Sequence, residues 1–149
     1  MSGIVCAVRG GPESRKSIDK AISLARKNKL SLYFVYIVNL DFMENSVRSN
    51  PHVITQQMEQ MGEFILLTAQ AAAKKKNIDS QTLIRRGDVT PQIIDLCHEL
   101  KADYLVLGRP KFEQENSLFT KEKLADFIES FEEQTGARVI MPEPEVDQQ

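Results

Sequence analysis

Residues 103–108 read DYLVLG, an acidic residue followed by four apolar residues and a glycine. An unbroken apolar run of this kind is typical of a parallel strand that is covered on both faces. Residues 3–8 (GIVCAV) and 30–38 (LSLYFVYIV) show the same pattern and predict two more buried strands. Residues 80–85 predict a strand at an edge of the sheet, and residues 137–141 (ARVIM) predict a short last strand.

Segments long enough for helices separate these strands. Apolar residues recur at helical spacing over residues 13–28, 53–76, 91–101 and 120–136. Parallel strands need crossovers of this length, and nearly all such crossovers are right-handed. The sequence therefore predicts an α/β domain with a doubly wound, five-stranded parallel sheet and helices on both faces. In such sheets ligands bind above the carboxyl ends of the strands, at the point where the strand order reverses.

Several side chains are predicted to set the ends of the helices. The hydroxyl of Thr90 caps one helix, with Pro91 in its first position. Thr120 is the best candidate for capping the last helix, and Gly136 is a good left-handed stop for it. Residues 39–52 are predicted to form a mobile loop. The helical stripe between residues 53 and 76 is predicted to be core, and it consists of Met58, Met61, Ile65, Thr68, Ala69 and Ala72.

Composition limits the possible partners and location of the protein. The 149 residues, 42% hydrophobic and 27% charged, are typical of one globular domain, predicted over 1–142 with a loose tail at 143–149. A net charge of −2 offers no overall positive field for nucleic acid or an anionic membrane. No apolar run reaches the length of about 20 residues that a membrane span needs, and no signal core follows Met1, so we expect a cytoplasmic protein. Cys6 and Cys97 lack metal-binding spacing and are expected to be buried.

The sequence offers little support for catalysis. Only two histidines occur, His52 in the predicted loop and His98 on the outer face of a predicted helix. No phosphate-binding Walker loop, serine nucleophile elbow or metalloprotease pattern is present. We therefore expect a binding protein, not an enzyme.

Three stretches carry a resemblance to a known family. Residues 87–108 combine a glycine turn and a helix with ADYLVLG, residues 5–14 read VCAVRGGPES, and residues 137–142 read ARVIMP. Over essentially its full length the chain resembles the universal stress proteins. The resemblance implies the strand order 3-2-1-4-5 and a homodimer, made by pairing the last strand, Ala137 to Met141, with its twofold mate. It also implies a stress-response or regulatory role through a protein partner.

The resemblance also identifies a nucleotide site, and this chain departs from it. Family members that bind ATP carry G-x-x-G, nine residues and then G-[S/T] after the fourth strand. Gly108 matches the first glycine, but Lys111 stands at the second and Lys121-Glu122 replaces the final pair. Arg9, just before Gly10, stands where ATP binders hold an aspartate, while Ile37 matches the apolar residue near the adenine. We therefore expect no ordinary ATP binding.

An alternative is that the cleft holds ATP, AMP or another anion by charge. Basic side chains at predicted strand ends could converge there, with Thr120 adding a hydroxyl: Arg9, Arg86, Arg109 and Lys111. The competing interpretation, which we favour, is that these side chains pair with surface carboxylates, namely Asp41, Asp88, Glu113 or Glu115. A third hypothesis is a nucleotide hydrolase or transferase of the wider adenine-nucleotide α-hydrolase group.

Overall fold

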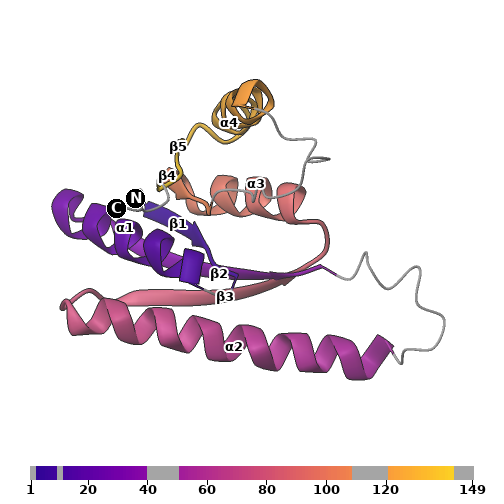
Figure 1. The fold of residues 1–149 in the computed structure, drawn as a ribbon. Helices are drawn as coiled ribbons and strands as arrows, with labels where there is room; N and C mark the ends of the chain where they lie inside the picture. The colour runs from indigo at the N-terminus through magenta and orange to yellow at the C-terminus, as the bar shows by residue number, and fades with distance from the viewer. Residues whose placement is uncertain (1–2, 10–11, 40–50, 109–120, 143–149) are drawn as a thin grey trace, which may run out of the picture.

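A computed structural model describes residues 3–9, 12–39, 51–108 and 121–142 of the chain (Figure 1). Its elements are β1 (Gly3–Ala7), α1 (Pro12–Asn28), β2 (Ser31–Val38), α2 (Pro51–Lys75), β3 (Ser80–Arg86), α3 (Val89–Leu100), β4 (Ala102–Val106), α4 (Lys121–Thr135) and β5 (Arg138–Ile140). The five strands form one sheet in the order β3-β2-β1-β4-β5, and every neighbouring pair is parallel. The predicted fold class and strand order are confirmed, including β3 at an edge.

Two hydrophobic cores lie on the two faces of the sheet. Side chains alternate along the strands, so that Ile4 and Cys6 of β1 pack with α1 and α2, whereas Val5 packs with α3 and α4. The strand order reverses between β1 and β4 because α1 leaves β1 on one face and α4 leaves β4 on the other. This arrangement places the switch point in the middle of the sheet.

The helix α2 differs from its predicted form in two ways. It begins at Pro51, so His52 lies in the helix and not in a loop. Its buried line consists of Gly62, Leu66, Ala69 and Ala73, whereas Met61 is 58% exposed; Thr68 is exposed as well. The prediction that Met61 and Thr68 belong to the core is wrong.

The length of α2 explains this difference. Its 25 residues span about 37 Å, whereas the eight residues of β2 span about 26 Å. The amino-terminal part of α2 therefore extends beyond the strands it covers (Figure 1). The methionines of that part face the space above the strand ends, while the carboxyl-terminal half packs on the sheet.

The start of α3 also differs from its prediction. The N-cap residue is Asp88, with no side-chain capping bond, so Thr90 and Pro91 occupy the second and third helical positions. The turn of Gly87, at φ 126°, brings the chain into the helix early, and the N–H of Gln92 donates to the carbonyl of Asp88 at 3.2 Å. The helix ends on Lys101 in the left-handed region, and β4 starts directly after it at Ala102, two residues before Tyr104, where the apolar run of the predicted strand begins.

The end of α4 agrees with its prediction. Gly136 adopts φ 74°, and its N–H donates to the carbonyl of Glu132 at 2.9 Å. The buried Thr135 hydroxyl donates to the carbonyl of Phe131 at 2.6 Å and accepts from the N–H of Ala137 at 3.0 Å. The chain therefore reverses tightly into β5. Thr120, most of the predicted loop at 39–52 and the tail at 143–149 lie outside the described residues.

Both cysteines are buried, as predicted. Burial raises the pKa of the Cys6 thiol and raises that of Cys97 to about 12, because the thiolate would lose its hydration. Both are packing residues of the two cores. Within the described ranges, none of the helices combines the length and hydropathy that crossing a bilayer requires.

Candidate functional site

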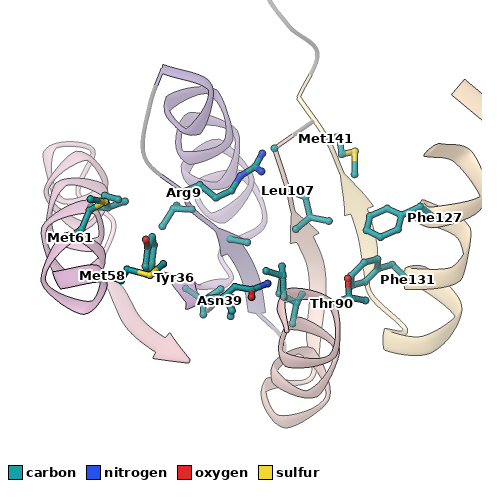
Figure 2. A pocket seen from close by; sticks show the side chains of 18 residues that line it. Arg9, Tyr36, Asn39, Met58, Met61, Thr90, Leu107, Phe127, Phe131 and Met141 are labelled. Atoms are coloured by element: carbon teal, nitrogen blue, oxygen red, sulfur yellow. The ribbon is translucent and has the colours of Figure 1, made fainter. Parts of the chain in front are cut away.

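A cavity of about 770 Å³ lies over the carboxyl ends of β1, β2 and β4 (Figure 2). This is the switch point of the sheet, where open α/β folds bind their ligands. Its volume falls within the range of about 300–1,000 Å³ that is usual for small-molecule pockets. The lining residues are Ala7, Val8, Arg9, Val35, Tyr36, Ile37, Asn39, Met58, Met61, Ile65, Val89, Thr90, Ile93, Leu107, Gly108, Phe127, Phe131 and Met141.

The cavity has two apolar ends, one on each face of the sheet. The first, which we call the α2 lobe, is formed by Tyr36, Met58, Met61 and Ile65. The second, the α4 lobe, is formed by Ile93, Leu107, Phe127, Phe131 and Met141. Figure 2 shows the labelled side chains of the two lobes at opposite ends of the cavity, with Arg9 between them. The cavity thus joins the two cores over the ends of the strands.

The α4 lobe is held in shape by an aromatic pair. Phe127 and Phe131 lie one turn apart on α4, and their ring centroids are 4.8 Å apart with the rings at 73°. This edge-to-face geometry is one that aromatic pairs prefer. Phe131 is buried, whereas Phe127 is half-buried and presents its ring to the cavity. A ligand would therefore meet a fixed aromatic surface at this end.

Arg9 lies between the two lobes of the cavity. It follows β1, its side chain is exposed, and its backbone N–H donates to the hydroxyl of Ser14 in α1 at 3.0 Å. A Cβ placed on Gly108 would lie 3.5 Å from Nη2 of Arg9. The guanidinium of Arg9 therefore lies close to the end of β4.

The buried hydroxyl of Ser17 lies beside Gly108. Ser17 is 1% exposed, and its Oγ has no hydrogen-bond partner among the residues that the structure describes. A Cβ on Gly108 would lie 3.7 Å from this oxygen. The Ser17 hydroxyl is therefore an unused hydrogen-bonding group beside the site. Leaving such a buried polar group without a hydrogen bond costs folding stability.

The structure brings together only part of the predicted site. Arg9, Ile37 and Gly108 all line the cavity. Gly10, Arg109, Lys111 and Thr120 lie outside the described residues, as do Asp41, Glu113 and Glu115.

The proposed convergence of Arg86 on the cleft is wrong. Its guanidinium forms an ion pair with Glu59 of α2, with Nε donating to Oε2 at 2.7 Å. Its neighbour Arg85 makes two hydrogen bonds of 3.2 Å with the carboxylate of Glu99. The favoured interpretation, pairing with a carboxylate, thus has the right chemistry for Arg86, but the partner is Glu59 and not Asp88. Both arginines at the end of β3 are engaged away from the cavity.

The lining residues that sequence reasoning missed are chiefly apolar. Met58 and Met61 are predicted as helix core, and Phe127 and Phe131 contribute to the apolar spacing that predicts the last helix; that spacing does not distinguish core from cavity wall. The available signal was the length of the segment 53–76, which exceeds what the neighbouring strands can cover. His98 is exposed on α3, as predicted, and does not line the cavity.

The chemistry of the lining favours binding. Among the lining residues described above, no carboxylate, histidine or cysteine occurs. Elsewhere in the described ranges, no group of three or more histidine, cysteine, aspartate or glutamate side chains could hold a metal ion. A hydrophobic cavity with few polar groups can select and hold a small molecule.

The family of the chain follows from a comparison with family models. The model described as the universal stress protein family matches residues 1–128. The chain belongs to the universal stress protein family. The match includes the whole segment from β1 to β4 and the first part of α4. No curated protein matches this universal stress protein significantly.

Solved structures of universal stress proteins share its fold. One from Burkholderia pseudomallei is 19% identical with a TM-score of 0.69, covering 95% of this chain and 96% of that one. One from Archaeoglobus fulgidus, in complex with dAMP, is 18% identical with a TM-score of 0.62, covering 96% and 98%. One from Arabidopsis thaliana, with AMP bound, is 12% identical with a TM-score of 0.66, covering 99% and 94%. At these identities the likeness establishes the fold.

Proposed function

We propose that this universal stress protein is a regulatory binding protein that takes a small ligand in the cavity and acts through a protein partner, without catalysis. The observation that carries the proposal is the 770 Å³ cavity at the switch point of the sheet. The described part of its lining holds no acid, base or nucleophile beyond the hydroxyls of Tyr36 and Thr90. Binding without turnover is the activity that such a lining supports best.

Ordinary ATP binding is not part of the proposal. The family's glycine pattern is broken at Lys111 and at Lys121-Glu122, so the backbone loses the close approach that glycine allows to phosphates. Arg9 also puts a positive charge where ATP binders hold an aspartate. Both departures weaken the usual contacts to a nucleoside triphosphate.

An adenine mononucleotide is a second candidate ligand. The similar proteins from Archaeoglobus fulgidus and Arabidopsis thaliana were solved with dAMP and AMP. In this chain, Arg9 is the one cation among the described lining residues, which suits a single phosphate better than three. Ile37 lines the cavity at the position that the resemblance assigns to the adenine.

A thermal melt tests the proposed function. We expect a saturable rise in melting temperature with AMP or with at least one carboxylate, a smaller rise or none with ATP, and inorganic phosphate serves as the control. Ligand at one hundred times its Kd stabilises the native state by about 2.7 kcal/mol, which is about 5–11 °C for a chain of this size. If no organic anion raises the melting temperature at millimolar concentration, the proposed function is wrong.

The proposed homodimer uses β5, which lies at an edge of the sheet. Its outward backbone groups and the half-buried Ile140 favour pairing with a second copy. One of these groups is already engaged, because the N–H of Val139 donates to a carboxylate oxygen of Glu132 at 3.0 Å. A second copy that pairs with β5 would have to accommodate the hydrogen bond between Val139 and Glu132 or replace it.

Sedimentation velocity tests the dimer. Replacing Glu132 by alanine frees the Val139 N–H, so the dimer fraction of Glu132→Ala should exceed that of the wild type at equal concentration. Glu133→Ala, at an exposed neighbouring position, serves as the control. Monomers at every concentration in wild type and Glu132→Ala would contradict pairing through β5.

A further inference from the structure

We propose that the natural ligand of the cavity is an apolar monoanion, an organic acid with a hydrocarbon body and one carboxylate. This inference rests on the proposed function and names the chemical class of its ligand. It follows from the distribution of polar and charged groups over the lining. Three observations support it in turn.

The first observation is the apolar character of both lobes. Of the 18 lining residues, four carry a polar side chain: Arg9, Tyr36, Asn39 and Thr90. The rest are aliphatic, aromatic or thioether side chains, or glycine. Such a surface stabilises hydrocarbon by removing it from water and offers little to a polar sugar or a polyphosphate.

The second observation is the adaptability of the α2 lobe. Met58 and Met61 enter it from the part of α2 that extends beyond the strands, and Met61 is largely exposed. Methionine is unbranched and polarizable, so it follows the shape of an apolar ligand closely. The fixed aromatic pair of the α4 lobe and the flexible thioethers of the α2 lobe suit a hydrocarbon body better than a rigid polar one.

The third observation is the positive charge of Arg9 between the lobes. Arg9 is the one charged lining residue within the described ranges, whereas Arg85 and Arg86 are held by Glu99 and Glu59. A guanidinium binds one carboxylate through two parallel hydrogen bonds. A ligand with one carboxylate would place it at Arg9 and its hydrocarbon in the adaptable α2 lobe, beside Met58 and Met61. A triphosphate would bring more negative charge than this one cation matches.

A chain-length series tests the apolar part of the ligand. Hexanoate, octanoate and decanoate are titrated by calorimetry below their micelle concentrations, with decanol as the uncharged probe and AMP as the nucleotide probe. Each CH₂ that enters a lobe should raise the affinity about fourfold until the lobe is filled. Decanoate should bind at least tenfold more tightly than decanol, because decanol lacks the carboxylate.

Two pairs of variants locate the binding. Arg9→Gln should lower the affinity for decanoate about tenfold and leave that for decanol unchanged, whereas Arg15→Gln, exposed on α1, should change neither. Met61→Asp should abolish decanoate binding. Phe64→Asp is its matched control, because Phe64 lies three residues further along the same helix, is 71% exposed and does not line the cavity. Circular dichroism melts verify that all four variants fold.

The outcomes separate this inference from the proposed function. Saturable AMP binding without decanoate binding would overturn the inference and leave the proposed function standing. If neither AMP nor any organic anion of the panel binds, both are overturned. Equal losses in Met61→Asp and Phe64→Asp would place the acid on the exposed outer face of α2, and an affinity independent of chain length would show adsorption; either result would overturn the inference.

Discussion

Replacing Gly62 by alanine should destabilise the protein, although alanine is the better helix former. Gly62 lies in α2 and is buried against the ring of Tyr36. A Cβ on Gly62 would lie 2.4, 2.8 and 2.9 Å from three carbons of that ring. Carbon atoms in contact are normally about 3.5–4.0 Å apart, so the ring would have to recede by about 1 Å. The ring packs against the core on one side and borders the cavity on the other, so the core side resists the shift while the cavity can take up part of it.

The net effect is the difference between two opposing effects. Alanine in place of glycine within a helix stabilises by about 1 kcal/mol. Overpacking a core by an extra carbon costs about 1–3 kcal/mol, and an approach of 2.4 Å belongs at the upper end. We expect Gly62→Ala to lose about 1–2 kcal/mol, equivalent to a fall of about 2–8 °C in melting temperature.

Urea denaturation followed by circular dichroism measures this loss, and a second substitution tests its cause. In a Tyr36→Ala background the ring is absent, so Gly62→Ala should become stabilising by about 1 kcal/mol. Ala71→Gly, at an exposed position of the same helix, calibrates helix propensity and should cost about 1 kcal/mol. A higher midpoint for Gly62→Ala in the wild-type background would refute the clash with Tyr36.

Three other predictions concern the helix end, the surface and the thiols. Gly136→Ala should cost about 1–2 kcal/mol in urea unfolding because of its φ of 74°, although a Cβ there meets no atom within 4 Å; an unchanged midpoint would contradict this. Glu59→Gln, which breaks the exposed pair with Arg86, should cost less than about 1 kcal/mol, and the loss should vanish in 1 M NaCl. Cys6 and Cys97 should not react with a thiol reagent at pH 8 unless urea is added, because burial raises both pKa values, that of Cys97 to about 12. Rapid labelling of the folded protein would contradict the burial of these thiols. The native state also retains thiol protons that the unfolded state loses, so the free energy of unfolding should fall as pH rises above about 9.

The fold was predicted from local patterns of apolar residues. Apolar runs such as DYLVLG specify buried strands, and helical spacing specifies the elements between them, because both patterns depend on neighbours within a few residues. The alternation of strands and helices then restricts the chain to a doubly wound sheet. The resemblance to the family identified Arg9, Ile37 and Gly108 as site residues, and they line one cavity because the carboxyl ends of parallel strands meet at one edge.

Predictions that depend on contacts between segments far apart in the sequence were less successful. Glu59 and Arg86 are 27 residues apart, and their pairing required the packing of α2 beside the end of β3. Met61 has the spacing of a core residue, but the helix extends past the sheet at that point, so the residue lines the cavity and is largely exposed. The identity of the N-cap, Asp88 instead of Thr90, depended on the turn at Gly87.

By itself, the sequence determined the class of the fold, the strands whose ends form the site and the departures from the family's glycine pattern, because each is written in the order of neighbouring residues. Only the tertiary structure decided the character of the site. Whether an apolar side chain on a helix becomes core or cavity wall depends on the relative lengths of the packed elements. Whether an arginine is available to bind a ligand depends on whether a neighbouring carboxylate already pairs with it. Both are properties of contacts between distant segments, and here they leave Arg9 as the one described cation lining a hydrophobic cavity.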